Sequence, residues 1–241
     1  MRDAIDRVPP NDGMGSMDIV LHQWVVSPYC AKVRRILRHK RLPFRTVEYN
    51  GLRALRVRKL SAAGKLPVLD YDGERITDSS AIAAYLEMRH PQPALFPDHP
   101  RQRAMAALWE DWADESLFWF EVYFRVHDTA ALDLAATAIC AGRPAWERLL
   151  IVPIFRRDYR ARLKAQGLGR LPEAEVDRLF DQHLDLLDTV LAENGKLVGA
   201  TTTIADIAVA AMLDEIIRTS ARGQRILARP HVRLWLEELA R

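Results

Sequence analysis

A serine, a tyrosine and a cysteine follow the first apolar segment of the chain, in the run Ser27-Pro28-Tyr29-Cys30. Residues 19–26 are apolar and rich in β-branched side chains, which predicts a buried strand. Ser27 can cap the helix that follows, and Pro28 suits its first turn, where a backbone N–H is not needed. A helix start combines free N–H groups with a positive dipole end, so an anion such as a thiolate is stabilised beside the Ser27 hydroxyl.

The helix after this run combines an apolar stripe with several basic residues. Helical spacing predicts one buried face, formed by Val33, Ile36, Leu37 and Leu42. We expect the basic residues to lie on the other faces: Lys32, Arg34, Arg35, Arg38 and Lys40. Ser27 either only caps this helix or also donates a hydrogen bond to a bound anion. Cys30 is typical of a small packing residue, although its spacing from Ser27 is that of a C-x-x-C redox motif with serine in first place.

The composition narrows the class of protein. Among 241 residues, 35 Lys and Arg exceed 32 Asp and Glu, which gives a net charge of +3. Because no nucleic-acid motif accompanies it, this mild excess does not favour nucleic acid as a partner, although it would suit small acidic ligands. Cys30 and Cys140, the two cysteines, allow no disulfide framework or zinc cluster, and the histidines lack metal-ligand spacing, so we expect no metal. Without a membrane-spanning apolar run or a signal-peptide core, the sequence predicts a cytoplasmic enzyme and no membrane partner.

The pattern along the chain predicts two domains. Residues 1–16 show no periodicity and are expected to be a disordered tail. Residues 17–90 have the pattern of a βαβ unit followed by a ββα unit, which is a thioredoxin-like α/β domain. Residues 91–100 are dense in proline and predict a linker. Residues 101–241 predict an all-α domain, with helices over 101–126, 130–141, 144–166, 173–193, 204–218 and 231–240.

Three further motifs have informative spacing. Lys65-Leu66-Pro67-Val68 puts a proline just ahead of a predicted strand. Thr77-Asp78-Ser79-Ser80 leads into a helix, and a helix start favours a carboxylate ligand. Thr203-Ile204-Ala205-Asp206 has the spacing of a capping box, in which Asp206 reaches back to the backbone of Thr203. We expect Thr203 and Asp206 to contribute stability rather than catalysis.

Taken in order, these motifs and the two domains resemble the soluble, cytosolic-type glutathione S-transferases over roughly residues 17–241. Ser27 stands where that family keeps its catalytic Ser, Cys or Tyr. Pro67 lies in a turn like its cis-proline turn, and Asp78-Ser79 resembles its acidic-Ser motif. Residues 163–176, with a Gly-x-Gly-Arg turn, together with Ser-Pro-Tyr-Cys are also similar to the metaxin-like branch of the superfamily, whose members need not be efficient transferases.

The resemblance implies a site for glutathione as co-substrate. A cis Pro67 would turn the backbone N–H and C=O of Leu66 outward, so that the cysteinyl part of glutathione pairs with them like an added strand. Ser79 and the helix start would bind the γ-glutamyl carboxylate, and Asp78 the ammonium group. Asp78 could alternatively serve as a simple N-cap.

The other implied contacts concern the glycyl end and the thiol. Lys65 would meet the glycyl carboxylate, unless it is a solvated lysine, and Tyr29 would pack beside the tripeptide. Lowering a thiol pKa from ~8.5 by ~2 units requires ~2.7 kcal/mol. A hydrogen bond to a charged group contributes ~1.5–3 kcal/mol, and a helix N-terminus ~0.3–1 kcal/mol. Ser27 therefore suffices as a hydrogen-bond donor, without a general base.

We accordingly predict a transferase that conjugates glutathione to a small apolar electrophile, or reduces that electrophile with it. The electrophile would lie against aromatic residues of the second domain, drawn from Trp109, Trp112, Phe118, Trp119, Phe120, Tyr123 and Phe124. Two alternatives stay open. One is a non-catalytic binding or scaffold protein of the same fold, and the other a thiol transferase or peroxidase that depends on an exposed, low-pKa Cys30. The resemblance also suggests a homodimer.

Overall fold

The computed structural model describes residues 17–240, so the predicted tail at 1–16 lies outside the described residues. The first part of the chain is a small α/β unit. Its strands form one sheet in the order β2-β1-β3-β4, where β1 and β2 are parallel and the other pairs antiparallel. Its elements are β1 (Ile19–Gln23), α1 (Pro28–His39), β2 (Arg45–Glu48), η1 (Gly51–Lys59), β3 (Val68–Tyr71), β4 (Glu74–Thr77) and α2 (Ser79–Arg89).

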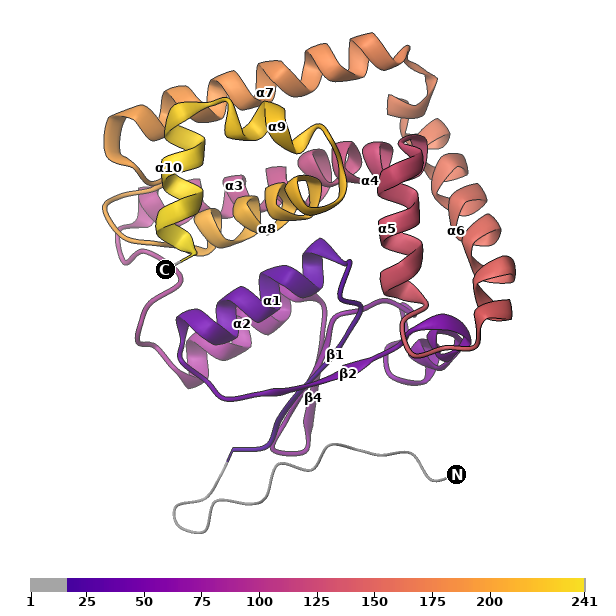
Figure 1. Cartoon of the computed structure of the whole chain (residues 1–241). Coiled ribbons are helices and arrows are strands. Elements are labelled where there is room, and N and C mark those ends of the chain that lie inside the picture. The colour runs from indigo at the N-terminus through magenta and orange to yellow at the C-terminus, as the bar shows by residue number, and fades with distance from the viewer. Residues whose placement is uncertain (1–16, 241) are drawn as a thin grey trace.

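The second part of the described chain is helical throughout, which confirms the predicted fold class. Helices α1 and α2 lie between the sheet and this helical part, and α8 packs on α1 (Figure 1). The elements are α3 (Pro100–Trp112), η2 (Ala113–Leu117), α4 (Phe118–His127), α5 (Thr129–Ile139), α6 (Ala145–Gln166), η3 (Leu168–Arg170), α7 (Glu173–Asn194), α8 (Ile204–Thr219), α9 (Gly223–Leu227) and α10 (Pro230–Leu239).

Two boundaries differ from the sequence prediction. The first strand ends at Gln23 rather than at residue 26, because the chain turns there and the Ser27 N–H donates to the Trp24 carbonyl at 3.1 Å. The helix expected over 101–126 is interrupted by η2, a π-helical turn. A π turn adds one residue per turn, so it rotates the side chains that follow it relative to those on α3.

The expectation that Lys32 and Lys40 lie on exposed faces of α1 is wrong. Both side chains are completely buried, because acidic groups from neighbouring elements surround their ammonium groups. Lys40 donates to Glu87 of α2 at 2.6 Å and to the carbonyls of His90 and Pro93 at 2.5 and 3.0 Å. Lys40 thus anchors the proline-rich segment after α2 against α1.

Helix α8 forms the centre of the helical part, and Asp206 holds its first turn. The side chain is fully buried and accepts four hydrogen bonds. One oxygen binds the Thr203 N–H at 2.9 Å and the Thr203 hydroxyl at 3.1 Å. The other binds the Leu197 N–H at 3.1 Å and the Trp235 indole N–H at 3.0 Å. The predicted capping box is therefore present, and it also ties α10 to α8.

Replacing Asp206 with alanine should destabilise the protein strongly. The change leaves buried donors of Thr203, Leu197 and Trp235 without acceptors, and each such group costs about 1–3 kcal/mol. We expect the free energy of unfolding, measured by urea denaturation, to fall by about 3 kcal/mol or more. Thr203→Ser, which keeps the hydroxyl, should lose only about 1 kcal/mol. An Asp206→Ala variant as stable as Thr203→Ser would contradict this role.

Candidate functional site

The register of the sheet brings three turns to one edge. In the antiparallel pair β1–β3, His22 lies opposite Val68, so the end of β1 adjoins the start of β3. In the pair β3–β4, Val68 lies opposite Thr77, so the end of β4 lies there as well. The turns that carry Ser27, Pro67 and Asp78 adjoin these strand ends. The N-termini of α1 and α2 consequently lie at the same edge, where two positive helix-dipole ends favour anions.

Ser27 is the N-cap of α1, and its side chain is half-buried. Its hydroxyl oxygen accepts a hydrogen bond from the Cys30 N–H at 3.3 Å. A side-chain hydrogen bond between this hydroxyl and the Cys30 thiol also lowers the pKa of that thiol, so the hydroxyl hydrogen can turn either to the Cys30 sulfur or to a ligand. Ser27 can therefore cap the helix and stabilise a bound thiolate at the same time.

A redox role would require the Cys30 thiol to be exposed and to have a lowered pKa, and it meets neither condition. Its side chain is fully buried in the first turn of α1. Burial raises the pKa of its thiol to about 11, although the Ser27 hydrogen bond and the nearby Arg34 partly oppose the rise. A thiol in this setting is protonated at neutral pH and unreactive. The burial of Cys30 is that of a packing residue, whereas Ser27 at the cap is only half-buried.

The other two turns have the backbone conformations that the resemblance implies. The Leu66–Pro67 peptide bond is cis, and Pro67 is buried while Lys65 before it is exposed. Asp78 adopts a φ of 79°, an uncommon conformation for a residue other than glycine. Such conformations cluster at functional sites. One carboxylate oxygen of Asp78 accepts from the N–H groups of residues 80 and 81 and so caps α2, as the N-cap interpretation predicts. The side chain remains exposed. Ser79 is buried.

Tyr29 connects the start of α1 to the helical part. Its hydroxyl donates to the Asp114 carbonyl of η2 at 2.7 Å, and its ring packs on Phe118 at 4.9 Å. Burial and the neighbouring Asp114 raise the pKa of Tyr29, so it stays neutral. Tyr29 thus fixes the wall of the site on the side of the helical part.

Sequence reasoning missed a buried ionic cluster next to these turns. The Lys32 ammonium group lies 2.6 Å from Glu110, 2.7 Å from Asp114 and 3.2 Å from the Ser80 hydroxyl. The Ser80 hydroxyl in turn donates to Glu110 at 2.8 Å. Burial raises the pKa of Asp114, Lys32 opposes the rise, and the charge of Asp78 adds to it. Helical spacing contained the signal, because Lys32 lies one turn before the buried Ile36.

A second cluster supports the backbone ahead of Ser27. The buried Arg125 of α4 donates to the Val26 carbonyl at 2.6 Å. Its guanidinium also contacts Glu121 and lies 3.7 Å from Glu215 of α8. Burial raises the pKa of Glu121 to about 7, with Arg125 opposing the rise. Arg125 therefore holds the turn that presents Ser27 against the helical core.

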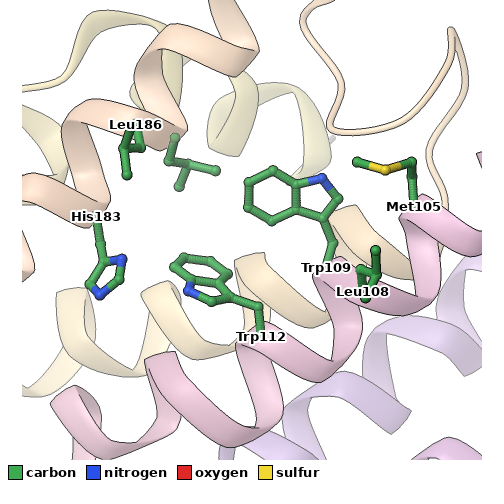
Figure 2. A pocket seen from close by; sticks show the side chains of 7 residues that line it. Met105, Leu108, Trp109, Trp112, His183 and Leu186 are labelled. Carbon is green, nitrogen blue, oxygen red and sulfur yellow. The ribbon is translucent and has the colours of Figure 1, made fainter.

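The aromatic residues predicted near the electrophile fall into separate places. Phe120, Tyr123 and Phe124 are buried core residues. Phe118 packs on Tyr29, and Trp119 packs on Phe118, so these two lie toward the site. Figure 2 shows that the remaining two face a different cavity, of about 260 Å³ between α3 and α7, lined by Met105, Leu108, Trp109, Trp112, His183, Leu186 and Leu187. The π turn explains the separation, since it lies between the two groups.

Comparison with known proteins assigns the N-terminal part of the chain to a domain family. Residues 21–94 match the family model of the glutathione S-transferase N-terminal domain. A glutathione S-transferase of Pseudomonas putida is 34% identical over 84 residues, which cover 35% of this chain and 38% of that protein. The isoprene-epoxide glutathione S-transferase of Rhodococcus sp. is 26% identical over 177 residues, covering 72% of this chain and 73% of that protein. The alignment thus spans well under half of the first relative's length.

Solved structures share the fold over nearly the whole chain. A glutathione S-transferase from Rhodospirillum rubrum superposes with a TM-score of 0.62 at 23% identity, covering 92% of this chain and 87% of that one. The β-etherase LigF of Sphingobium sp. superposes with a TM-score of 0.60 at 21% identity, covering 91% and 99%. Within residues 17–240 no three acidic, His or Cys side chains are grouped as metal ligands. No helix in that range has the length and apolarity needed to cross a bilayer.

The two cysteines should differ in reactivity. Cys30 is buried with a pKa of about 11, whereas Cys140 is only partly buried. We expect iodoacetamide at neutral pH to alkylate Cys140 first, and Cys30 only after denaturant is added, as read by peptide mass spectrometry. Fast alkylation of Cys30 in the native protein would contradict its assignment as a packing residue and would favour the redox alternative.

Proposed function

We propose that this chain, whose residues 21–94 match the glutathione S-transferase N-terminal domain, is a soluble glutathione transferase acting at the sheet edge described above. The main support for this proposal is that three features meet at one edge of the sheet: the capped start of α1, the cis Pro67 turn and the start of α2. This edge offers hydrogen-bond donors for a thiolate, an exposed backbone segment and a carboxylate site. Glutathione has the three matching groups in the same order.

The binding roles proposed here follow the chemistry of each turn. The N–H groups at the start of α2, with Ser79, bind the γ-glutamyl carboxylate. The free oxygen of Asp78 accepts from the ammonium group, and the acidic residues Glu110 and Asp114 add negative potential nearby. The Leu66 backbone pairs with the cysteinyl part. Lys65, which is exposed, meets the glycyl carboxylate.

The proposed reaction needs no base from the protein. The Ser27 hydroxyl donates to the glutathione sulfur and, with the dipole of α1, favours loss of the thiol proton to solvent. The thiolate then attacks the electrophilic carbon and forms a C–S bond. A halide or phenolate departs with the bonding electron pair, or an epoxide ring opens and its oxygen takes a proton from water. Phe118 and Trp119 favour a small apolar electrophile.

We further propose a cytoplasmic homodimer. The cavity between α3 and α7 is bordered by exposed apolar side chains, with Leu108 and Leu186 each 64% exposed and Met105 43% exposed. An apolar surface of this kind is covered at low cost by a second copy of the chain. The cytoplasm supplies reduced glutathione.

Ser27→Ala tests the catalytic assignment. Losing a hydrogen bond to a charged sulfur should lower kcat/KM with a model aryl halide about 10- to 100-fold, corresponding to ~1.5–3 kcal/mol. Because only the ionised thiol reacts, kcat/KM rises with pH through the thiol pKa, and the midpoint should move to higher pH in the variant.

Cys30→Ala, in the first turn of the helix that Ser27 caps, is the matched control. It should keep most of the activity, since the thiol does not face the site. Full activity in Ser27→Ala would refute the role of Ser27. Loss of activity in Cys30→Ala but not in Ser27→Ala would favour the Cys30-dependent alternative.

Leu108→Glu tests the dimer. A charge at the rim of the α3–α7 cavity opposes burial of this surface against a second copy. The variant should therefore elute as a monomer in size-exclusion chromatography with light scattering. Leu234→Glu, at an exposed leucine on α10, is the control and should remain dimeric. A wild-type monomer, or a Leu108→Glu dimer, would contradict this arrangement.

A further inference from the structure

Helix α6 exposes a row of large apolar side chains on the face that points away from the protein. Trp146 and Leu150 are each 53% exposed, Leu149 is 76% exposed and Ile154 is 68% exposed. Their spacing of three, four and eight residues puts them on one side of the helix. Pro153 lies exposed among them. Few soluble proteins expose so much apolar surface on one helix without a binding role.

The same side of α6 is basic further along. Arg157, Arg160 and Lys164 continue the row at spacings of three and four residues, and all are exposed. Of the acidic residues of α6, Glu147 is buried and paired with Arg143, and Asp158, one turn after Ile154 at the border of this side, is paired with Arg162. We call the side formed by Trp146, Leu149, Leu150, Pro153, Ile154, Arg157, Arg160 and Lys164 the outer face of α6. It contains no acidic side chain.

The position of α6 leaves this face accessible in one copy of the chain. In Figure 1 α6 stands at the edge of the helical part, outside α5. Its opposite side packs inward through Phe155 and Leu163. The neighbouring η1, joined to the first turn of α6 by the hydrogen bond from the Leu52 N–H to Glu147, exposes a further apolar side chain, Leu55, at 72%.

We infer that the outer face of α6 docks on an anionic lipid bilayer. Surface-bound helices combine a row of Trp and Leu with Lys and Arg, so that the apolar side chains enter the headgroup region while the cations contact lipid phosphates. A helix of 22 residues lying flat can use both halves of the outer face at once. The cytoplasmic leaflet has the negative surface potential that the three cations require. A contact that relied on apolar surface alone would not require a face without acidic groups, whereas contact with an anionic bilayer does.

The test uses the full chain and vesicles of stated composition. We expect the protein to co-sediment with phosphatidylcholine vesicles containing about 30 mol% phosphatidylserine, and at least about tenfold less with pure phosphatidylcholine. Raising the salt from about 0.1 M to about 1 M should weaken binding, because shorter Debye lengths screen the cations. Two double variants should each reduce partitioning at least about tenfold: Leu149→Ser with Leu150→Ser, and Arg157→Glu with Arg160→Glu.

A matched control separates this surface from general hydrophobicity and charge. Arg233→Glu with Leu234→Ser changes an exposed cation and an exposed leucine on α10, and should bind vesicles like the wild type. Circular dichroism and transferase activity report whether each variant is folded. Absence of binding to anionic vesicles would overturn the inference, as would binding that the α6 variants leave unchanged. If the α6 variants instead alter only the oligomeric state, the face is a contact between copies and the lipid inference is wrong.

Discussion

The buried ammonium group of Lys32 holds together the elements on which the site depends. It reaches from α1 to Glu110 and Asp114 of the α3–η2 segment and to Ser80 at the start of α2. Removing one member of such a cluster leaves an uncompensated buried charge, which is costly. This contact therefore helps to set the relative position of the two helix starts and of the helical wall. The position of Tyr29 depends on the same arrangement, because its hydroxyl donates a hydrogen bond to the Asp114 carbonyl.

Charge is divided around the proposed glutathione site. The starts of α1 and α2 offer positive dipole ends, and in the proposal these meet the thiolate and the γ-glutamyl carboxylate, while the free oxygen of Asp78 meets the ammonium group. Behind Ser27, Arg125 binds the Val26 carbonyl and keeps the turn in place. The proposed reaction thus needs few reacting groups from the protein, because fixed donors and dipoles would prepare the site for a ligand that brings its own nucleophile.

The sequence was sufficient for most of the elements and for the turns, although it predicted neither α9 nor the break at η2. Apolar periodicity located β1, α1 and α8, and the spacing of Thr203 and Asp206 predicted a capping box that the structure contains. The sequence was insufficient where ion pairs between residues far apart in the chain allow a charged side chain to be buried. Lys32 and Lys40 are charged residues on an apolar stripe, and only partners far along the chain make their burial favourable. The π turn at η2 likewise has no local signal, yet it separates Trp109 and Trp112 from Phe118. The roles of Lys65 and Ser79 stay predictions.

The pKa of the glutathione thiol in the bound state tests the central claim most directly. It can be measured from the ultraviolet absorbance of the thiolate as a function of pH, at glutathione concentrations that calorimetry shows to be saturating. The account predicts saturable binding and a thiol pKa about 2 units below its free value of ~8.5 in the wild type. No binding at millimolar glutathione, or a bound thiol with its free pKa, would contradict the account and favour a scaffold of the same fold.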